Sequence, residues 1–420
     1  MPTNDIKVQD VMAGTALKYL KNSLVMAKLV SRGYEGEFSK EVNGYKKGAT
    51  VRVRRPENFT PTSGATLSVA DVEEATTTVT VDQQYNKGLS FTGQELTLLL
   101  SGGEGLKRVG DEKIGPLMHA FANKVDSDLH GLYTSVYNWV GTPGQTIDSF
   151  PDFLKGTERM DEFAVPSAGR NAVLSPADNA GLLGAFHNLN QNAETAKNAL
   201  QRARLPLIGN CDAYMSQNVR THTVGVATGT PLVNGGSQNV TYAASKATWT
   251  QSLVTDGWTN STTGILKAGD IITIANVFAV NPIDGATLPF LRQFTVTADA
   301  NSGASTGPAT LTISPPIITS GAYKTCSAAP ADNAAITVLG TGATGYRQNM
   351  IFHKSAFHLA IVPMELDEVM HGSVMTDDGV SVRVTRAFDI TNDVSTFRFD
   401  ILYGVKCLRP DLAVRLSGTS

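Results

Sequence analysis

The chain has little charge. Asp, Glu, Lys and Arg make up 17% of its 420 residues, against about a quarter in an average soluble domain. The shortage is greatest between about residues 225 and 345, where Thr, Ser, Ala, Gly and Asn take their place. A free monomer with so much uncharged surface would lose solubility, whereas a subunit covered by its neighbours would not. The formal net charge of −3 also gives no basic footprint for wrapping nucleic acid.

Cysteine and long apolar runs are scarce as well. Cys211, Cys326 and Cys407 are widely separated and form no CxxC or Cys–His cluster, so we predict reduced, mostly buried thiols rather than a zinc site or disulfides. No stretch approaches the roughly 18 apolar residues of a membrane span. The start of the chain also lacks the pattern of a signal peptide. We therefore expect a soluble protein made inside the cell, with no membrane partner.

Catalytic patterns are missing too. His353 and His358 are five residues apart, unlike the two ligands of a His-Glu-x-x-His zinc motif, and are predicted to be structural. The adjacent carboxylates Asp367-Glu368 and Asp377-Asp378 are typical of solvated loops rather than of an acid–base pair. No Gly-x-Ser-x-Gly elbow or cysteine–histidine arrangement stands out. We predict that the protein is not an enzyme and uses no cofactor or metal.

Helical periodicity marks the first and the central part of the chain. Residues 5–30 carry an apolar stripe, so we expect one amphipathic helix that must pack on something, with another subunit as one option. A longer stripe predicts a helix over about 104–138, and Thr92 to Glu95 matches a capping box for a short helix before it. Gly102 and Gly103 lack the Gly-Lys-Ser/Thr ending of a phosphate loop and are predicted to be a hinge. Pro116 would lie in the first turn of the long helix or kink it.

Strand patterns surround and follow these helices. Val51–Pro56 and Thr76–Val81 alternate and predict a long hairpin, which is too small to be stable alone and is plausible as an arm across a neighbour. Around residues 221–345, short strands such as 271–280 indicate an inserted β module. Near the end, 380–385 and 397–403 alternate around a turn at 391–393, which predicts a sheet packed on the long helix.

One basic cluster stands out on the predicted hairpin. Two interpretations remain open for it. It is either a solvated strand edge, where basic side chains discourage unwanted pairing, or an arm whose cations meet carboxylates of an adjacent subunit. The candidate subunit-contact residues are Lys46, Lys47, Arg52, Arg54 and Arg55.

Several segments together resemble the coat proteins of tailed bacteriophages. Asn22–Val30 and Lys47-Gly-x-x-Val-x-Val-Arg-Arg-Pro56 are similar to the opening of these proteins, and Leu402–Pro410 with Leu412–Leu416 resembles their end. The pattern Lys267-Ala-Gly-Asp-Ile-Ile is similar to the first strands of the β-barrel that is inserted in coat proteins of short-tailed Salmonella phages. The resemblance covers most of the chain.

This resemblance implies an α+β fold of the Hong Kong 97 type with an inserted antiparallel β-barrel domain. Placed on this sequence, the expected segments follow one another along the chain. They are an N-terminal arm (1–35), an extended loop (36–92), a peripheral domain with a spine helix (93–145), a first axial part (146–220), the barrel (221–345), a second axial part (346–379), and the peripheral β-hairpin with the C-terminus (380–420).

The resemblance also implies a function. We expect a major capsid protein that self-assembles into the hexamers and pentamers of an icosahedral shell enclosing double-stranded DNA, without binding the DNA specifically. A scaffolding protein and a portal are implied partners, and the shell would be assembled in the bacterial host cytoplasm and mature from a procapsid to the virion capsid. The alternative is a soluble carbohydrate- or surface-binding protein whose β module is the recognition domain.

Overall fold

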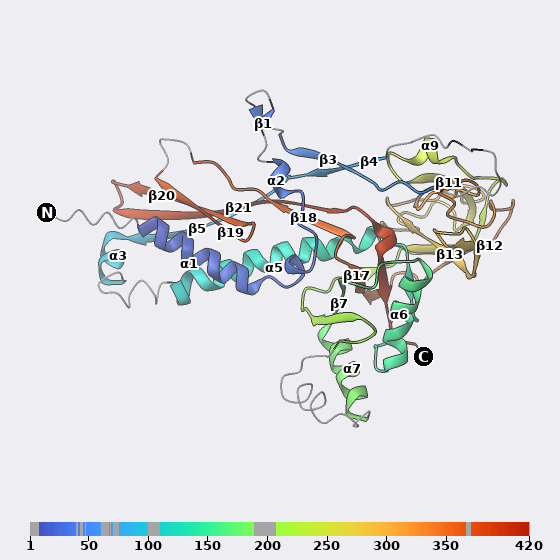
Figure 1. Cartoon of the computed structure of the whole chain (residues 1–420), viewed down its shortest axis with the longest axis horizontal. Coiled ribbons are helices and arrows are strands. Elements are labelled where there is room, and N and C mark those ends of the chain that lie inside the picture. Colours follow the sequence, from blue (N-terminus) through green and yellow to red (C-terminus); the bar gives the residue numbers. More distant parts are fainter. Residues whose placement is uncertain are drawn as a thin grey trace. The chain divides into compact units, whose positions relative to one another are not determined.

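The computed structural model describes residues 8–38, 41–42, 45–46, 48–59, 67, 69, 75–99, 110–188, 207–366 and 371–419. The chain divides into two compact units (Figure 1). The first unit comprises Met1–Arg52, Thr78–Leu129 and His358–Lys406, and the second comprises Val53–Thr77, His130–Phe357 and Cys407–Ser420. A helix that the sequence predicts over 193–204 lies outside the described residues.

The first unit is built on a sheet from the end of the chain. Its strand order is β18 (Phe357–Ile361), β21 (Val394–Cys407), β20 (Val380–Asp389) and β19 (Gly372–Asp377), and β5 (Gln83–Thr92) pairs antiparallel along β21. The two alternating strands predicted around residues 391–393 are confirmed. Their apolar positions are buried, as a half-covered sheet requires: Val380, Val382, Val384, Phe397, Phe399, Ile401 and Tyr403.

The opposite face of β20 and β21, which carries the polar residues, is not fully exposed to water. Asp400 is 1% exposed, although its alternation with apolar residues predicts that it faces water. Arg383 donates to it through Nη2 at 2.9 Å and Nε at 3.2 Å, and Arg398 donates through Nε at 2.9 Å. A buried carboxylate needs such partners, because an uncompensated charge inside a protein is costly.

The N-terminal helix α1 (Val8–Ser23) packs on β19 and β20 of its own chain. Its buried side chains repeat at helical spacing, as predicted: Met12, Ala13, Ala16, Leu17 and Leu20. The alternative that another subunit covers this helix is therefore not needed. The 3₁₀ turn η1 (Met26–Lys28) and the short helix α2 (Glu35–Phe38) follow it.

The predicted long helix is observed as three consecutive pieces, with residues 104–109 outside the described part. They are the π-helical turn η2 (Gly110–Ile114), the α-helix α5 (Gly115–Gly131) and the 3₁₀ turn η3 (Leu132–Ser135). Tyr403 of β21 donates to Asp128 of α5 at 2.7 Å, so the long helix does contact this sheet. The capping box is confirmed as well, since Thr92 Oγ1 accepts from Glu95 N at 3.2 Å at the start of α3 (Gly93–Leu99).

Two strand pairs precede α3. β1 (Glu41–Val42) pairs with β2 (Tyr45–Lys46), and β3 (Thr50–Arg54) pairs with β4 (Thr76–Thr80). Hydrogen bonds from Arg55 N to Ala75 O and from Val81 N to Ala49 O bracket the second pair and make it antiparallel. The predicted hairpin is thus confirmed.

The second unit contains a sheet whose strands come from both sides of the predicted insertion. Its order is β6 (Trp139–Val140), β22 (Ala413–Leu416), β17 (Asn349–His353), β7 (Arg170–Leu174) and β8 (Cys211–Met215). Helices α6 (Phe150–Glu162) and α7 (Pro176–Asn188) accompany it, and the turn η4 (Pro410–Leu412) leads into β22. Ser175 caps α7 by accepting from Asp178 N at 3.3 Å, as its position before Pro176 predicts.

Between these strands the chain forms a six-stranded antiparallel sheet. Its order is β10 (Gly229–Val233), β11 (Gln251–Trp258), β14 (Ala309–Ser314), β13 (Thr287–Val296), β12 (Ile271–Val280) and β15 (Ile336–Val338). A bridge between Leu232 and Ala335 links the two edges of the order, which nearly closes the sheet into a barrel. Below, "the barrel" means these six strands and their loops, including the short helix α9 (Tyr242–Ser245).

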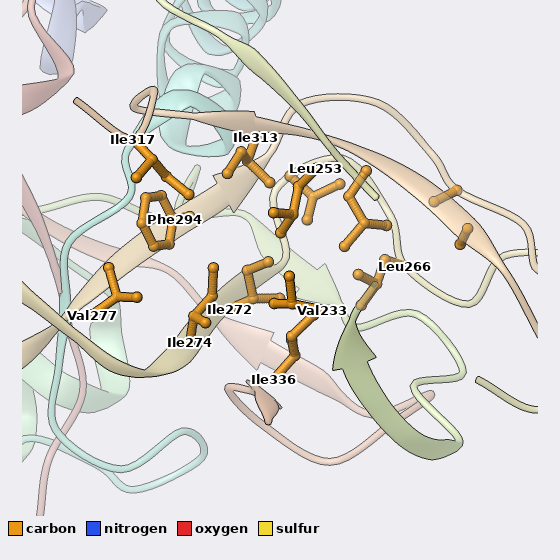
Figure 2. Close-up of a cluster of buried hydrophobic side chains, with 14 of the residues drawn as sticks. Val233, Leu253, Leu266, Ile272, Ile274, Val277, Phe294, Ile313, Ile317 and Ile336 are labelled. Atoms are coloured by element: carbon orange, nitrogen blue, oxygen red, sulfur yellow. The ribbon is translucent and has the colours of Figure 1, made fainter. Parts of the chain in front are cut away.

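The barrel has its own apolar core. Figure 2 shows aliphatic side chains and one phenylalanine pointing toward one another from the strands that surround them. Ile272, Phe294 and Ile313 are each 0% exposed. A core of this size can hold the barrel together without charged side chains, since apolar burial is the main stabilising term in folding.

The chain enters and leaves the barrel side by side. β9 (Thr221–Thr223) pairs antiparallel with β16 (Gly345–Arg347) just outside the barrel strands. This pair forms a two-stranded stem at the two ends of the inserted sequence. β18 and β19 pair in one sheet with β20 and β21, and residues 407–419 belong to the second unit.

Candidate assembly site

The basic residues of the predicted hairpin do not form one cluster. β3 alternates strictly, with Val51 and Val53 buried and Arg52 and Arg54 exposed. Successive side chains of a strand point to opposite faces, so the two arginines share the solvent face. Arg55 follows the strand and is only partly exposed. The structure therefore brings Arg52 and Arg54 together and separates Arg55 from them.

The remaining candidate residues are less well placed. Lys46 lies at the end of β2, but its side chain is not described, and Lys47, Gly102 and Gly103 lie outside the described residues. Pro116 is the second residue of α5 and is exposed. A proline inside a helix removes one backbone hydrogen bond and crowds the carbonyl of the preceding turn. The wider π turn of η2, directly before α5, lies where that crowding falls.

A second candidate region joins the barrel to the rest of the second unit, and we call it the barrel junction. It consists of the residues around Asp270 and His222, the end of β13, and Arg415. The Asp270 carboxylate, which is fully buried, accepts from His222 Nε2 at 2.7 Å, from Gly225 N at 3.0 Å and from Lys267 N at 2.7 Å. It thereby ties the stem strand β9 to the loop that opens β12.

The ring of His222 continues this network. Because a carboxylate can only accept, Nε2 carries the proton that is shared with Asp270. The other ring nitrogen, Nδ1, lies 3.1 Å from the Tyr133 hydroxyl of η3 and accepts from it when the ring is neutral. Burial raises the pKa of Tyr133, which keeps its hydroxyl proton available as a donor.

Arg415 of β22 lies at the centre of the junction with 0% exposure. Its Nη1 donates to Gly269 O at 2.7 Å and to Gln348 Oε1 at 3.3 Å. Its guanidinium carbon lies 5.2 Å from the ring centroid of Tyr133 and 5.8 Å from that of Trp139. Burial lowers the pKa of Arg415 to about 9, so the aromatic faces and carbonyl oxygens replace only part of its lost hydration.

The end of β13 makes a strand-like contact with β6. Trp139 N donates to Gln293 Oε1 at 2.7 Å, and Gln293 Nε2 donates to Trp139 O at 2.8 Å. The side-chain amide thus satisfies both backbone groups of Trp139, as a neighbouring strand would. Thr295 Oγ1 adds a bond to Thr134 O at 2.8 Å. These bonds hold the barrel without exposed ion pairs, which are individually weak.

Aromatic and cationic side chains pack along the middle of β13. Phe290 packs edge-on against Phe163 with centroids 6.0 Å apart, and the Arg159 guanidinium lies 3.5 Å from the Phe290 centroid. Arg292 is 4% exposed and stacks on Tyr137 at 4.6 Å. Burial raises the pKa of Tyr137 to about 12. The charge-poor barrel is therefore docked through hydrogen bonds and aromatic contacts.

Sequence reasoning did not find this junction. Its central residues are Asp270, His222, Gln293 and Arg415, and of these only Asp270 stands out in the sequence, as part of the Lys267-Ala-Gly-Asp pattern. An acidic residue directly before a strongly apolar strand, in a stretch with few charges, is the signal that could have drawn attention to it. The other partners come from segments far apart in the chain.

The chemical alternatives gain no support. In the described part of the chain no group of His, Cys, Asp and Glu could hold a metal ion. Burial lowers the pKa of His353, and it lowers the pKa of His358 to about 4. The three cysteines are free and buried, as predicted. Among the described helices, none has the length and apolar character needed to cross a membrane.

Comparison with known proteins decides the family. The model of the family described as "P22 coat protein - gene protein 5" matches residues 1–418. The chain belongs to the P22 coat protein family. It is a phage capsid protein that forms part of the shell of the virion, and its role there is structural rather than enzymatic. The carbohydrate-binding alternative has no observation in its favour.

The chain is also similar to individual proteins. The chain is similar to a "Major capsid protein" of Acyrthosiphon pisum secondary endosymbiont phage 1, with 23% identity over 412 residues and 94% of each chain covered. Among solved structures it is similar to "Mycobacterium phage Che8" (14% identity, 93% and 90% of the two chains, TM-score 0.46). It is also similar to the "CUS-3 coat protein I-domain" (27% identity, 27% of this chain and 96% of that chain, TM-score 0.19).

Proposed function

We propose that this member of the P22 coat protein family self-assembles into the hexamers and pentamers of an icosahedral shell that encloses double-stranded DNA. The observation that carries the proposal is the family match over residues 1–418. In a closed symmetric shell each modest contact is repeated many times, so no single contact has to be strong. A net charge of −3 suits a container that does not hold DNA by its phosphates.

Each segment expected along the chain has its own proposed role in the shell. An arm (1–35) and an extended loop (36–92) grip neighbouring subunits, and a peripheral part (93–145 and 380–420) carries the spine helix and the terminal sheet. Two axial parts (146–220 and 346–379) flank the barrel (221–345). Assembly would take place in the bacterial host cytoplasm with a scaffolding protein and a portal as partners.

The basic face of β3 is the proposed subunit contact. Arg52 and Arg54 are exposed on one face of a strand whose other face is buried, so their guanidinium groups can reach carboxylates of an adjacent subunit. Lys46, Lys47 and Arg55 remain candidates for the same contact. Gly102, Gly103 and Pro116 are the proposed hinge, at which the spine helix would change its bend when the precursor shell expands.

Expression of the full chain, alone and with its neighbouring gene products, tests the proposal. We expect megadalton particles on size exclusion and closed shells in negative-stain microscopy. Reversing Arg52 and Arg54 to glutamate should lower the yield of closed shells, because the contact would become repulsive. Lys354→Glu is the control, since it reverses the same sign of charge at an exposed side chain in the turn between β17 and β18. A small oligomer under every condition contradicts the shell, and unchanged yield in the double variant contradicts the arginine contact.

A further inference from the structure

Three aromatic side chains form a cluster on the outside of the barrel, which we call the aromatic bracket. They are Tyr242 of α9, Trp249 and Tyr323, and all three are partly exposed. The rings of Tyr242 and Tyr323 are stacked with centroids 3.6 Å apart and planes 2° from parallel. Trp249 meets Tyr242 edge-on at 6.2 Å. Within the described residues, the core cluster of the barrel contains none of the three.

Trp249 has an uncommon backbone conformation. Its φ is 55°, in the left-handed region that a bulky residue adopts only at a cost. The turn is held by Trp249 N, which donates to Ser245 O at 2.8 Å, and by the buried Ser245 hydroxyl, which donates to Thr241 O at 3.1 Å. Such strain persists where the surroundings fix it, and it gathers at functional positions. Since the core does not use this ring, its position needs another reason.

The bracket is occupied by the base of the extended loop. The guanidinium carbon of Arg55 lies 5.3 Å from the centroid of the Trp249 ring. Asn58 N donates to the Tyr323 hydroxyl at 3.2 Å, three residues further along the loop. Both contacts lie inside the second unit, which contains Val53–Thr77 as well as the barrel.

Arg55 also ties the returning strand of the hairpin to this place. Its Nε donates to Thr77 Oγ1 at 3.1 Å, and its backbone N donates to Ala75 O at 2.9 Å. Burial lowers the pKa of Arg55. A guanidinium that has lost part of its hydration gains most from an aromatic face, because the attraction to the ring is stronger when water is excluded. Arg55 therefore differs from Arg52 and Arg54, which stay in solvent.

We propose that the aromatic bracket is the site at which the barrel holds the base of its own extended loop, and that this hold sets the path of the loop during shell assembly. The proposal rests on the shell function proposed above. It makes the barrel an intrachain anchor for the segment that grips neighbours. Arg55 is then an internal anchor, whereas Arg52 and Arg54 are exposed on the solvent face of β3.

The anchor itself is tested on the unassembled full chain by hydrogen exchange. Replacing Arg55 with alanine, or Trp249 with glycine (which tolerates the same φ), should speed exchange of the Asn58 amide at least tenfold. Tyr323→Phe should do the same at Asn58 alone, because it removes only the hydroxyl. Ile283→Ala is the control, since Ile283 is 74% exposed on the same barrel and outside the bracket. Equal exchange in wild type and bracket variants would overturn the anchor.

The consequence for assembly is tested on the particles that the same variants form. Arg55→Ala and Trp249→Gly should give a larger share of open or wrongly sized particles, with Arg55→Lys intermediate because it keeps the charge but not the planar group. Particles of wild-type size and shape in both variants, with the amide of Asn58 exposed, would refute the role in setting the loop path. If the wild type forms no particles, the shell proposal fails, and the exchange data still decide whether the anchor exists.

Discussion

At the scale of single residues, the molecule repeatedly buries a charge or a polar ring and surrounds it with specific partners. Asp270 accepts three hydrogen bonds, and Asp400 is bracketed by two arginines. Arg415 has carbonyl acceptors and aromatic faces, while its Nε and Nη2 have no partner among the described residues. Removing one member of such a group leaves the other uncompensated, which costs more than the pair contributes.

His358 is the opposite case, a buried ring without a hydrogen bond. It is 0% exposed, both ring nitrogens lack a partner in the described part of the chain, and the ring of Tyr34 lies edge-on at 5.1 Å. Burial, with a smaller effect from Arg32, lowers its pKa to about 4. The unfolded chain, in which His titrates near 6.5, binds more protons between pH 6.5 and 4. The free energy of unfolding therefore falls as the pH falls through this window.

His358→Leu removes this titration and no hydrogen bond. When the pH is lowered from 7.5 to 4.5, we expect the free energy of unfolding of the variant to rise by about 2 kcal/mol relative to that of the wild type. The reason is that each unit of pKa shift corresponds to about 1.4 kcal/mol. Urea unfolding of the unassembled subunit at the two pH values measures it. His130, whose pKa burial lowers to about 3, is common to both proteins and cancels. A difference that does not change with pH contradicts the assignment.

At the scale of elements, local pattern predicts what local forces determine. The alternation of Val380, Val382 and Val384 predicts the terminal strands, and Ser175 before Pro176 predicts the start of α7, because periodicity and capping act within a few residues. The barrel junction could not be predicted in this way. Arg415 donates to Gly269, which lies 146 residues away in the chain. The sequence around either residue does not indicate this contact.

The partner of α1 shows the same limit. Its apolar stripe predicts a buried face, but a stripe does not say what buries it. From the sequence alone, a neighbouring subunit is one possible packing partner of this helix. In the structure, β19 and β20 of the same chain cover it. The burial of Asp400 was not apparent from its own strand for a related reason, since one of its two arginine partners, Arg383, lies on the neighbouring strand β20.

The loop that opens β12 is the element on which the junction depends. Gly269 has a φ of 103°, and a Cβ added there would lie 3.0 Å from Thr134 Cγ2 and 3.2 Å from His222 Cε1. Gly235 has a φ of 89° on the same barrel, but an added Cβ would meet nothing within 4 Å. The two glycines share the conformational requirement and differ only in the contact.

Gly269→Ala should therefore cost more than Gly235→Ala. We expect a loss of about 1 kcal/mol at Gly235 from the positive φ alone, and about 2–3 kcal/mol at Gly269, where the neighbours must also shift. Denaturant unfolding of the unassembled chain compares the two. Equal losses in the free energy of unfolding would mean that the residues around Gly269 shift without cost. This would contradict a tightly packed barrel junction.

At the scale of the whole molecule, the shortage of charge has a structural counterpart in the second unit. The barrel folds around an apolar core, and its junction uses one buried carboxylate, amide contacts and aromatic stacking rather than exposed ion pairs. The stem of β9 and β16 adds a covalent and hydrogen-bonded connection. These contacts attach the inserted domain to the rest of the second unit.

Electron cryo-microscopy of shells formed by the wild-type chain tests this account most directly. We predict closed icosahedral shells in which every subunit shows its barrel at side-chain detail, with His222 beside Asp270 and Gln293 paired with Trp139. Closed shells in which the barrel density is smeared, or a chain that stays a small oligomer in all conditions, would contradict it.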